Sequence, residues 1–287
     1  MILVTGASGN LGTSVIENLL KQVPASEIAG LFRNPDKAKT FSEQGINVRI
    51  GDYENKALLT KAFYGIDKLL LISSSGNDAL TAHKNAIDAA KEVGVKHIYY
   101  TSGALNTNVS HSQLGPLADA YLTTENYIKA SGMTYTIFQN ALYAETIPFF
   151  VGEKVLETGI YLPAGNSKAS FATRGDMAEA IANVIASDGH DNKTYVTSAL
   201  PSYSFTEIAG ILSELSGKKV SYTNAEPNDY ENRLRAANVD EESIWYLSLL
   251  TAIIKNNEYD IASSDLEQLL GRKPTDLKTY LKETFLA

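Results

Sequence analysis

Three glycines near the amino end have the types and spacing that phosphate binding needs. Gly6, Gly9 and Gly12 form the pattern G-x-x-G-x-x-G. They stand between an apolar run, Ile2–Thr5, and an amphipathic stretch that begins at Asn10. In such a loop the first glycine permits a tight turn, the second lets the backbone approach a pyrophosphate, and the third lets a helix pack close to a sheet. The free N–H groups at the start of that helix favour an anion. The pattern therefore predicts a dinucleotide site, and the competing interpretation is a glycine-rich turn without a ligand.

The end of the second apolar run bears on which dinucleotide would bind. NAD sites usually carry Asp or Glu there, which binds the ribose 2′-hydroxyl. Here Arg33 follows Phe32, and the nearest acid, Asp36, lies beyond a proline. A guanidinium can hold a 2′-phosphate by charge-assisted hydrogen bonds, and Lys37 would add positive charge nearby. The sequence therefore favours NADP over NAD; the alternative is that Arg33 is a solvated surface side chain.

Polar residues also follow the next three apolar runs. They are Asp52-Tyr53, Ser73-Ser74-Ser75 and Thr101-Ser102. Open α/β sheets bind ligands at the carboxyl ends of their strands. We expect Asp52 near the adenine and the serines beside the pyrophosphate and the nicotinamide ribose. Thr101 and Ser102 are expected to contact the cofactor or to orient a substrate. Asp52 is equally well explained as a helix cap or a turn residue.

These positions are ordered by an alternation of strands and helices through the first half of the chain. Six apolar runs predict strands: Ile2–Thr5, Ile28–Phe32, Ile46–Ile50, Asp67–Ile72, His97–Thr101 and Thr134–Phe138. The stretches between them predict helices over Asn10–Gln22, Asn34–Glu43, Asn55–Phe63, Asn77–Val93 and Leu117–Ala130. This alternation is typical of an α/β fold with a Rossmann-type, doubly wound parallel sheet.

The regular alternation of strands and helices ends after Asn140. Segments that resemble strands are Ile160–Leu162, Thr194–Thr197 and Val220–Tyr222. Helical patterns cover Arg174–Ala186, Ser204–Leu215, Asp229–Ala237, Glu241–Lys255, Leu266–Leu270 and a segment from Thr275. We therefore expect a dinucleotide-binding domain over residues 1–150 and a smaller, mostly helical substrate-cleft lobe over residues 151–287. That lobe should contribute one or two strands to the main sheet.

Composition excludes several classes of function. The 287 residues are 44% hydrophobic and 20% charged, which is an ordinary globular balance. The net charge of −8 argues against a nucleic-acid surface. No apolar run reaches the ~20 residues of a membrane helix, and no charged leader precedes the first strand. The chain has no cysteine, so disulfides and thiolate chemistry are excluded. We expect a cytoplasmic protein that binds neither nucleic acid nor membrane.

Several histidines and aromatic residues have structural explanations. The four histidines lack the spacing of a metal motif, so no metal site is expected. His83 is interpreted as a satisfied structural side chain rather than a cleft residue. His111, in the polar loop of residues 106–113, fits a cover over the site and plain surface equally well. We expect Phe149 and Phe150 in the core between the domains, and Trp245 in the core or at a subunit contact.

Motifs along most of the chain resemble those of the NmrA-like branch of the atypical short-chain dehydrogenases. The most specific of them are Phe32-Arg33-Asn34-Pro35 and Asn140-Ala141-Leu142-Tyr143. Further matches are Val4–Gly12, Gly51-Asp52-Tyr53, Gly94–Ser102 and Ala172-Thr173-Arg174. Within that branch, the sequence is most similar to bacterial NADPH:quinone oxidoreductases of the second type and to triphenylmethane dye reductases.

The resemblance implies a Rossmann domain with a small C-terminal lobe and the active site in the cleft between them. It also implies NADPH as the hydride donor and a quinone, or another flat, electron-poor ring, as the acceptor. A homodimer would be consistent with it. Positions that match the family's cofactor contacts are Gly6, Ser8, Gly9, Asn10, Leu11, Arg33, Ser73 and Ser74. Asn140 and Tyr143 match the stretch that lines the nicotinamide and the acceptor, and we expect them to be the catalytic residues.

One departure limits the chemistry. Ordinary short-chain dehydrogenases use Tyr-x-x-x-Lys, in which the lysine depresses the pKa of the tyrosine. The candidate here is Tyr121, and Glu125 stands four residues later in place of the lysine. Alcohol–ketone chemistry by that pair is therefore not expected. Quinone reduction does not require this lysine, because aromatisation stabilises the product oxyanion and solvent can supply the proton. No residue is assigned as a proton donor.

The sequence is thus interpreted as an NADPH-dependent oxidoreductase that reduces quinones or similar aromatic acceptors by direct hydride transfer. The alternative is a regulatory protein of the NmrA type, which binds the dinucleotide without turnover and reports redox state to a partner. The missing lysine fits that alternative equally well. An epimerase or an isoflavonoid-type reductase is a third interpretation, which would need a clearer acid–base residue.

Overall fold

A computed structural model describes residues 1–74, 78–105, 112 and 115–286. A parallel sheet of seven strands forms its centre, in the order β11-β6-β5-β4-β1-β2-β3. The strands are β1 (Ile2–Val4), β2 (Ile28–Phe32), β3 (Asn47–Ile50), β4 (Lys68–Ile72), β5 (His97–Gly103), β6 (Thr134–Asn140) and β11 (Lys193–Thr197). The expected Rossmann-type, doubly wound parallel sheet is therefore confirmed.

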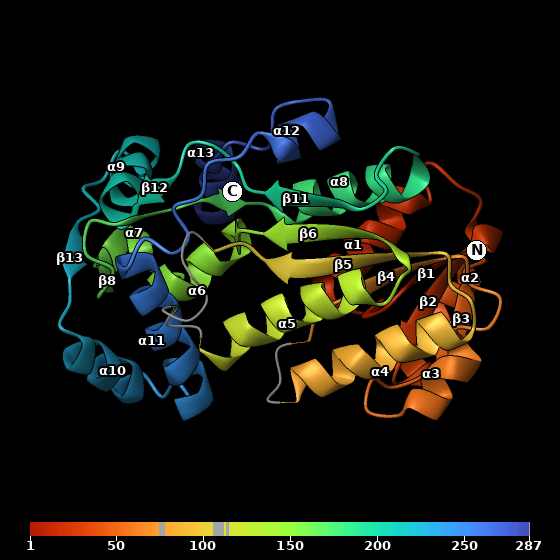
Figure 1. Cartoon of the computed structure of the whole chain (residues 1–287). Helices are drawn as coiled ribbons and strands as arrows, with labels where there is room; N and C mark the ends of the chain where they lie inside the picture. Colours follow the sequence, from red (N-terminus) through yellow and green to blue (C-terminus); the bar gives the residue numbers. More distant parts are fainter. Residues whose placement is uncertain (75–77, 106–111, 113–114, 287) are drawn as a thin grey trace.

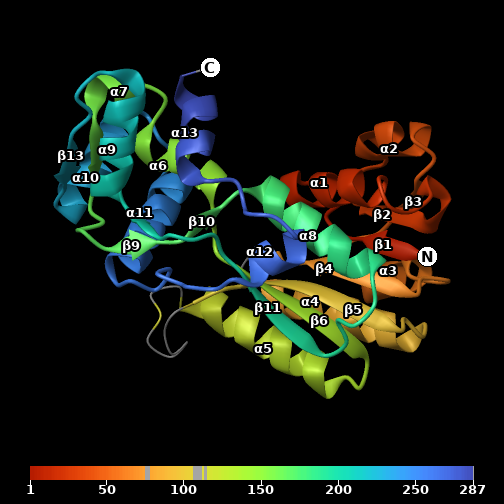
Figure 2. The same ribbon diagram turned by 90° about the horizontal axis from the view of Figure 1, so that it is seen from above.

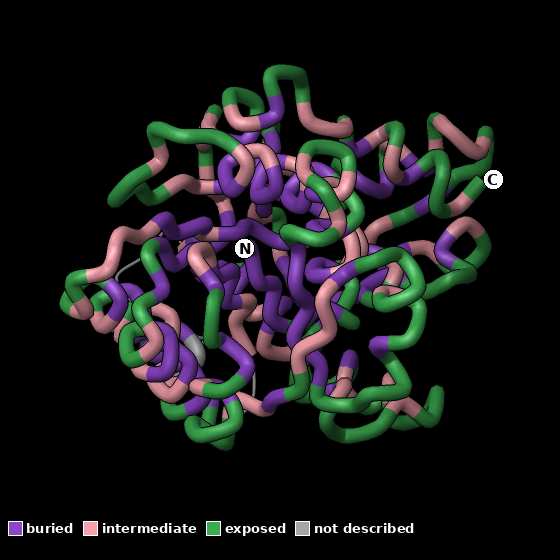
Figure 3. The backbone as a smooth tube through the Cα atoms, turned by 90° about the vertical axis from the view of Figure 1, so that its right-hand side faces the viewer, coloured by how far each residue is buried: buried purple, intermediate pink, exposed green. Residues whose placement is uncertain are grey.

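Helices cover both faces of this sheet, which is why its central strands are apolar almost throughout. One face carries α1 (Asn10–Leu19), α8 (Arg174–Ala186) and α12 (Asp265–Leu270), and the other α3 (Lys56–Ala62), α4 (Ala79–Glu92) and α5 (Pro116–Ala130) (Figure 2). The expected second helix is split into a 3-10 turn, Pro35–Ala38, and the short α2 (Lys39–Glu43). Buried segments run through the middle of the molecule, and exposed turns surround them (Figure 3).

A second apolar core lies in the lobe toward which the arrowheads of β5 and β6 point (Figure 1). Its longer helices are α9 (Phe205–Ser216), α10 (Pro227–Ala236), α11 (Glu241–Lys255) and α13 (Leu277–Phe285). Its shorter elements are α6 (Ile147–Val151), α7 (Val155–Thr158) and three two-stranded pairs. The pairs are β7 (Leu142–Tyr143) with β10 (Phe171–Ala172), β9 (Lys168–Ala169) with β12 (Tyr203–Ser204), and β8 (Ile160–Leu162) with β13 (Tyr222–Asn224).

The chain crosses between the sheet and the lobe more than once. After the first lobe elements it returns through α8 and β11, and β11 pairs with β6 at the edge of the sheet. It then enters the lobe again and comes back to pack α12 against α8. Elements of both halves of the chain thus position the site, while the division at residue 150 stays a prediction.

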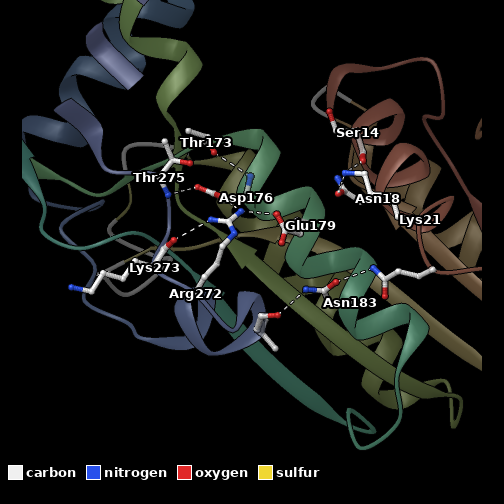
Figure 4. A network of polar contacts seen from close by, with 12 residues as sticks. Ser14, Asn18, Lys21, Thr173, Asp176, Glu179, Asn183, Arg272, Lys273 and Thr275 are labelled. Atoms are coloured by element: carbon white, nitrogen blue, oxygen red, sulfur yellow. Dashed lines mark hydrogen bonds and ion pairs between the residues drawn. The ribbon is translucent and has the colours of Figure 1, made fainter. Parts of the chain in front are cut away.

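A polar network ties the C-terminal part of the chain to the start of α8 (Figure 4). The guanidinium of Arg272 donates to the carboxylates of Asp176 (2.7 Å) and Glu179 (2.5 Å). The backbone N–H of Thr275 donates to the other oxygen of Asp176 at 2.6 Å. Asp176 is buried, so these partners satisfy a carboxylate that water does not reach. The network holds the first turn of α8, which carries Arg174 of the site described below.

One aromatic placement expected from the sequence was wrong, and one of the two interpretations of another is excluded. Phe150 is buried and packs on Phe205, but its neighbour Phe149 is 50% exposed, because a short helix buries only one side. Trp245 is not a core residue, since its side chain is 64% exposed. On α11 the inward face carries Ile244 and Leu247, and residue 245 is rotated about 100° from its neighbour. The subunit-contact interpretation of Trp245 stays a prediction.

Candidate active site

The glycine loop joins β1 to α1 and shapes the expected phosphate site. Gly6 has φ +57°, which favours glycine, and its carbonyl accepts a hydrogen bond from the N–H of Gly9 at 2.9 Å. A Cβ on Gly12 would lie far inside van der Waals contact of that same carbonyl oxygen. Among the residues that the structure describes, no side chain caps the first turn of α1, which starts at Asn10. Its first N–H groups have no partner within the helix and can therefore bind an anion. Ser8, Gly9 and Asn10 are exposed, whereas Leu11 packs into the core.

The loop lies at the point where the strand order reverses. β1 pairs with β2 on one side and with β4 on the other, and open α/β sheets bind their ligands at the carboxyl ends of the strands at such a point. Arg33 follows β2 on the same edge and is exposed. Within the described parts of the chain its guanidinium forms no ion pair. Asp36 is held in the following turn, where its N–H donates to the side chain of Asn34 at 2.8 Å. The geometry thus leaves Arg33 available for a 2′-phosphate.

Tyr53 ties the ends of β1 and β4 together. Its hydroxyl donates to the carbonyl of Ile72 at 2.9 Å and also lies against the hydroxyl of Thr5. Burial raises the pKa of Tyr53, so this hydroxyl stays protonated. The Asp52 carboxylate accepts from the N–H of Glu54 at 3.1 Å, which is a turn interaction. The structure therefore supports the turn interpretation of Asp52, and its contact with the adenine stays a prediction.

Buried side chains position the segment that follows β4. The N–H of Ser73 donates to Thr101 Oγ1 at 3.0 Å, and the N–H of Ser74 donates to His83 Nε2 at 2.9 Å. His83 Nδ1 lies 2.9 Å from Thr124 Oγ1. Because the ring is fully buried, the pKa of His83 is lowered to about 4 and the imidazole is neutral. The structural interpretation of His83 is confirmed, and its role is to hold the backbone of Ser74.

Ser102 belongs to a network centred on Glu125. The hydroxyl of Ser102 donates to the Glu125 carboxylate at 2.7 Å. Gln139 Nε2 and Lys129 Nζ lie 3.0 and 3.4 Å from that carboxylate. Glu125 is only 4% exposed, so these groups supply the hydrogen-bond partners that its buried carboxyl group needs. In this structure Ser102 and Thr101 hold neighbouring protein groups, and their direct contact with the cofactor stays a prediction.

Asn140 and Tyr143 lie together at the carboxyl end of β6. Asn140 Nδ2 donates to the Tyr143 hydroxyl at 3.3 Å, and Asn140 Oδ1 accepts from Thr197 Oγ1 at 2.6 Å. The guanidinium carbon of Arg174 lies 4.4 Å from the centre of the Tyr143 ring. The Glu145 carboxylate accepts from the N–H of Arg174 at 2.9 Å and so caps the start of α8. Burial raises the pKa of Tyr143, so its hydroxyl is neutral.

Sequence reasoning missed that further tyrosines gather around Tyr143. Tyr143 and Tyr246 of α11 raise the pKa of Tyr121 of α5. All three of these tyrosines raise the pKa of Tyr259. Burial is the larger cause of the raised pKa of Tyr121, Tyr246 and Tyr259. The signal in the sequence was general: 16 tyrosines against nine phenylalanines. Only folding could show which of the 16 converge. We call Tyr121, Tyr143, Tyr246 and Tyr259 the tyrosine cluster.

Two cavities are each lined in part by Glu145. The smaller, about 360 Å³, is lined by α1, by the start of α8 and by Glu145 between β7 and α6; its residues are Asn10, Thr13, Ser14, Glu17, Glu145, Arg174 and Gly175. It gives the expected pyrophosphate site open space directly at the start of α1. The larger, about 590 Å³, lies in the lobe between α6 and α10, and its described lining includes Glu145 but neither Asn140 nor Tyr143. The larger cavity is therefore separate from Asn140 and Tyr143, whose catalytic role stays a prediction.

Some expectations fall outside the described parts of the chain or concern absences. Ser75 and His111 are not among the described residues. Across residues 1–74, 78–105, 112 and 115–286, no three His, Asp or Glu side chains are grouped as a metal site requires. No helix within the same ranges combines the length and the apolar character that crossing a membrane demands.

Known proteins resemble this chain over its whole length. The model of the NmrA-like family matches residues 1–284. Quinone oxidoreductase 2 of Escherichia coli is 41% identical, with 99% of both chains covered. The structure of Citrobacter sp. triphenylmethane reductase complexed with NADP(H) has a TM-score of 0.92 and 40% identity, covering 99% of this chain and 100% of that one. The structure of the E. coli NADPH-dependent quinone oxidoreductase complexed with NADPH has a TM-score of 0.92, 37% identity and the same coverage.

Proposed function

Because this chain belongs to the NmrA-like family, we propose that it transfers a hydride from NADPH to a quinone or a similar flat, electron-poor aromatic acceptor. The chain is an oxidoreductase with NADPH as its cofactor. Its relatives with full-length coverage are a quinone oxidoreductase and a triphenylmethane reductase, and structures of both kinds contain the phosphorylated dinucleotide.

The observation that carries this proposal is the pair of Asn140 and Tyr143 at the carboxyl end of β6, where the Asn140 amide donates to the Tyr143 hydroxyl. The pKa of Tyr143 is raised by burial, with Asn140 as its hydrogen-bond partner. A neutral phenol donates a hydrogen bond but cannot act as the base that alcohol oxidation needs. It can stabilise an oxyanion that forms when a hydride reaches a quinone. A site with such a donor is therefore suited to reducing a carbonyl acceptor.

The other residues bind and orient. The glycine loop and the free N–H groups of α1 would hold the pyrophosphate, and Arg33 the 2′-phosphate. The ribose of the nicotinamide would lie beside Ser73 and Ser74, whose backbone N–H groups donate to Thr101 and His83. When bound, NADPH supplies the hydride. Asn140 then fixes the Tyr143 hydroxyl, and Arg174 fixes its ring.

We extend the proposal to location and partners. Similarity to a bacterial quinone oxidoreductase supports a cytoplasmic protein with a small-molecule quinone as its substrate. The net charge of −8 supports the absence of a nucleic-acid partner. A homodimer is part of the same proposal, and sedimentation of the purified chain tests it.

The first experiment is the oxidation of NADPH by the purified protein with a panel of benzoquinones and naphthoquinones. We expect enzyme-dependent loss of NADPH absorbance, with NADH much less effective. Deuterium on the transferred position of the nicotinamide should lower the rate, because the hydride moves directly to the acceptor. Tight NADPH binding without turnover in the same preparation would contradict the proposal and favour the regulatory alternative.

A further inference from the structure

Tyr121 is a member of the tyrosine cluster that has no role in the reaction proposed above. The Tyr121 ring lies directly against Gly103 at the end of β5. A Cβ at Gly103 would be 2.7 Å from Tyr121 Cε2 and 2.9 Å from Cδ2. Only glycine at this position leaves room for the ring where it now lies.

The pairing of β5 and β6 places Tyr121 beside the proposed catalytic pair. Gly103 is opposite Asn140 in the register, and the N–H of Ala104 donates to the Asn140 carbonyl at 2.9 Å. Neighbouring strands are about 4.8 Å apart. The Tyr121 ring therefore rests on one strand while Tyr143 is held by the side chain of Asn140 on the next.

The hydroxyl of Tyr121 interacts with Ser73 at the end of β4, beside the expected nicotinamide ribose. Burial is the main reason that the pKa of Tyr121 is raised, and the phenols of Tyr143 and Tyr246 raise it further, whereas the interaction with Ser73 lowers it. On the same helix Glu125 is engaged by Ser102 and cannot assist a tyrosinate. Tyr121 is thus a half-buried phenol that keeps its proton at the edge where the acceptor must lie.

We propose that Tyr121 donates a hydrogen bond to a carbonyl oxygen of the quinone as the hydride arrives. This inference rests on the proposed function and assigns it one more residue. The quinone accepts a hydride, and with it two electrons, and becomes a hydroquinone anion. That anion takes one proton from solvent, and Tyr121 keeps its own. The donor strengthens its interaction as charge develops on the oxygen, so it acts mainly on kcat.

The test is Tyr121→Phe, which keeps the ring on Gly103 and removes only the hydroxyl. Loss of one preorganised donor to a developing oxyanion costs about 10²-fold in kcat, and we expect a fall of that order with the quinones that the wild type reduces. KM for the quinone and Kd for NADPH should stay within about twofold. The matched control is Tyr64→Phe, because Tyr64 is 75% exposed; it should leave both constants unchanged.

A second variant separates the hydroxyl from the fold. Gly103→Ala retains Tyr121 but forces its ring to move, so kcat should fall by a similar factor. Adding Tyr121→Phe to Gly103→Ala should lower kcat little further, since both changes remove the same hydrogen bond from the Tyr121 hydroxyl. A kcat of Tyr121→Phe within twofold of wild type overturns this inference and leaves the proposed function standing. A wild type that binds NADPH but reduces no quinone overturns the proposed function instead.

Discussion

At the scale of single residues, what each polar group can do depends on whether the protein already occupies it. The guanidinium of Arg174 stacks on Tyr143 and pairs with Glu145. The hydroxyl of Ser102 is engaged by Glu125. Arg33, by contrast, is an exposed cation without an ion pair in the described ranges, at the edge where a dinucleotide phosphate is expected. A cation without an ion pair at the ligand-binding edge of the sheet can bind the ligand. Polar groups that already have protein partners hold the neighbouring side chains in place.

Arg33→Ala tests the choice of cofactor. Hydrogen bonds to a charged group contribute about 1.5–3 kcal/mol, so Kd for NADPH should rise by about 10- to 150-fold. Kd for NADH should change little, because that cofactor lacks the 2′-phosphate. Fluorescence titration with both dinucleotides measures this. Arg235→Ala, in the exposed ion pairs of α10, is the control. Equal losses for NADPH and NADH would refute the role of Arg33.

At the scale of elements, the turn between β1 and α1 decides whether a phosphate can be bound. The turn closes through the hydrogen bond from Gly9 to the carbonyl of Gly6, and α1 then passes over that carbonyl at Gly12. A side chain at this crossing would push the helix away from the loop. The N–H groups that face the ligand belong to that same helix turn. Packing and binding therefore depend on one contact.

Gly12→Ala tests this dependence. The added Cβ collides with backbone, which cannot rotate away, so we expect destabilisation of about 1–3 kcal/mol. NADPH and NADH should both bind more than about tenfold more weakly, since they share the pyrophosphate. Gly210→Ala is the matched control, because Gly210 lies inside α9 with open space around it.

For Gly210→Ala we expect the opposite sign in stability, a gain of roughly 0.5–1 kcal/mol. Urea unfolding and cofactor titration measure both variants. Unchanged affinity in Gly12→Ala would place the phosphate elsewhere.

At the scale of the whole molecule, the site exists because the lobe lies at the carboxyl ends of the strands. β6 leads through β7 into the lobe, and the chain returns to pair β11 with β6. The crossings bring α11, with Tyr246, to the same place as α5, with Tyr121. The interior of the folded molecule also buries the imidazoles of His83 and His97. The pKa of His83 and of His97 is lowered to about 4, chiefly by burial.

These two histidines predict how stability depends on pH. Both are neutral in the folded protein down to about pH 4 but take up protons near pH 6.5 when unfolded. The stability is therefore complete above pH 6.5 and is lost as the pH falls from 6.5 toward 4. At pH 5 the loss is roughly 2 kcal/mol per histidine.

Urea unfolding at pH 7 and pH 5 measures this loss, and His83→Gln should remove about half of it. A free energy of unfolding that is flat between these pH values would contradict the argument.

The sequence by itself determined the local features. The strands and helices of the sheet, the glycine turn, the cation at Arg33 and the pair Asn140 and Tyr143 depend on periodicity, backbone freedom and neighbours close along the chain. The short α6 and α7 were missed because a helix of one or two turns has too few residues to show a period.

Only the tertiary structure decided what depends on distant contacts. It buried Phe150 and exposed Phe149, bound Ser102 to Glu125, and placed Tyr121 on Gly103 beside Asn140. The pKa values of the tyrosines and histidines follow from burial, which is a property of the packed molecule. The sequence shows which residue types are present. The hydrogen bonds and pKa values of these side chains depend on partners that folding brings from other strands and helices.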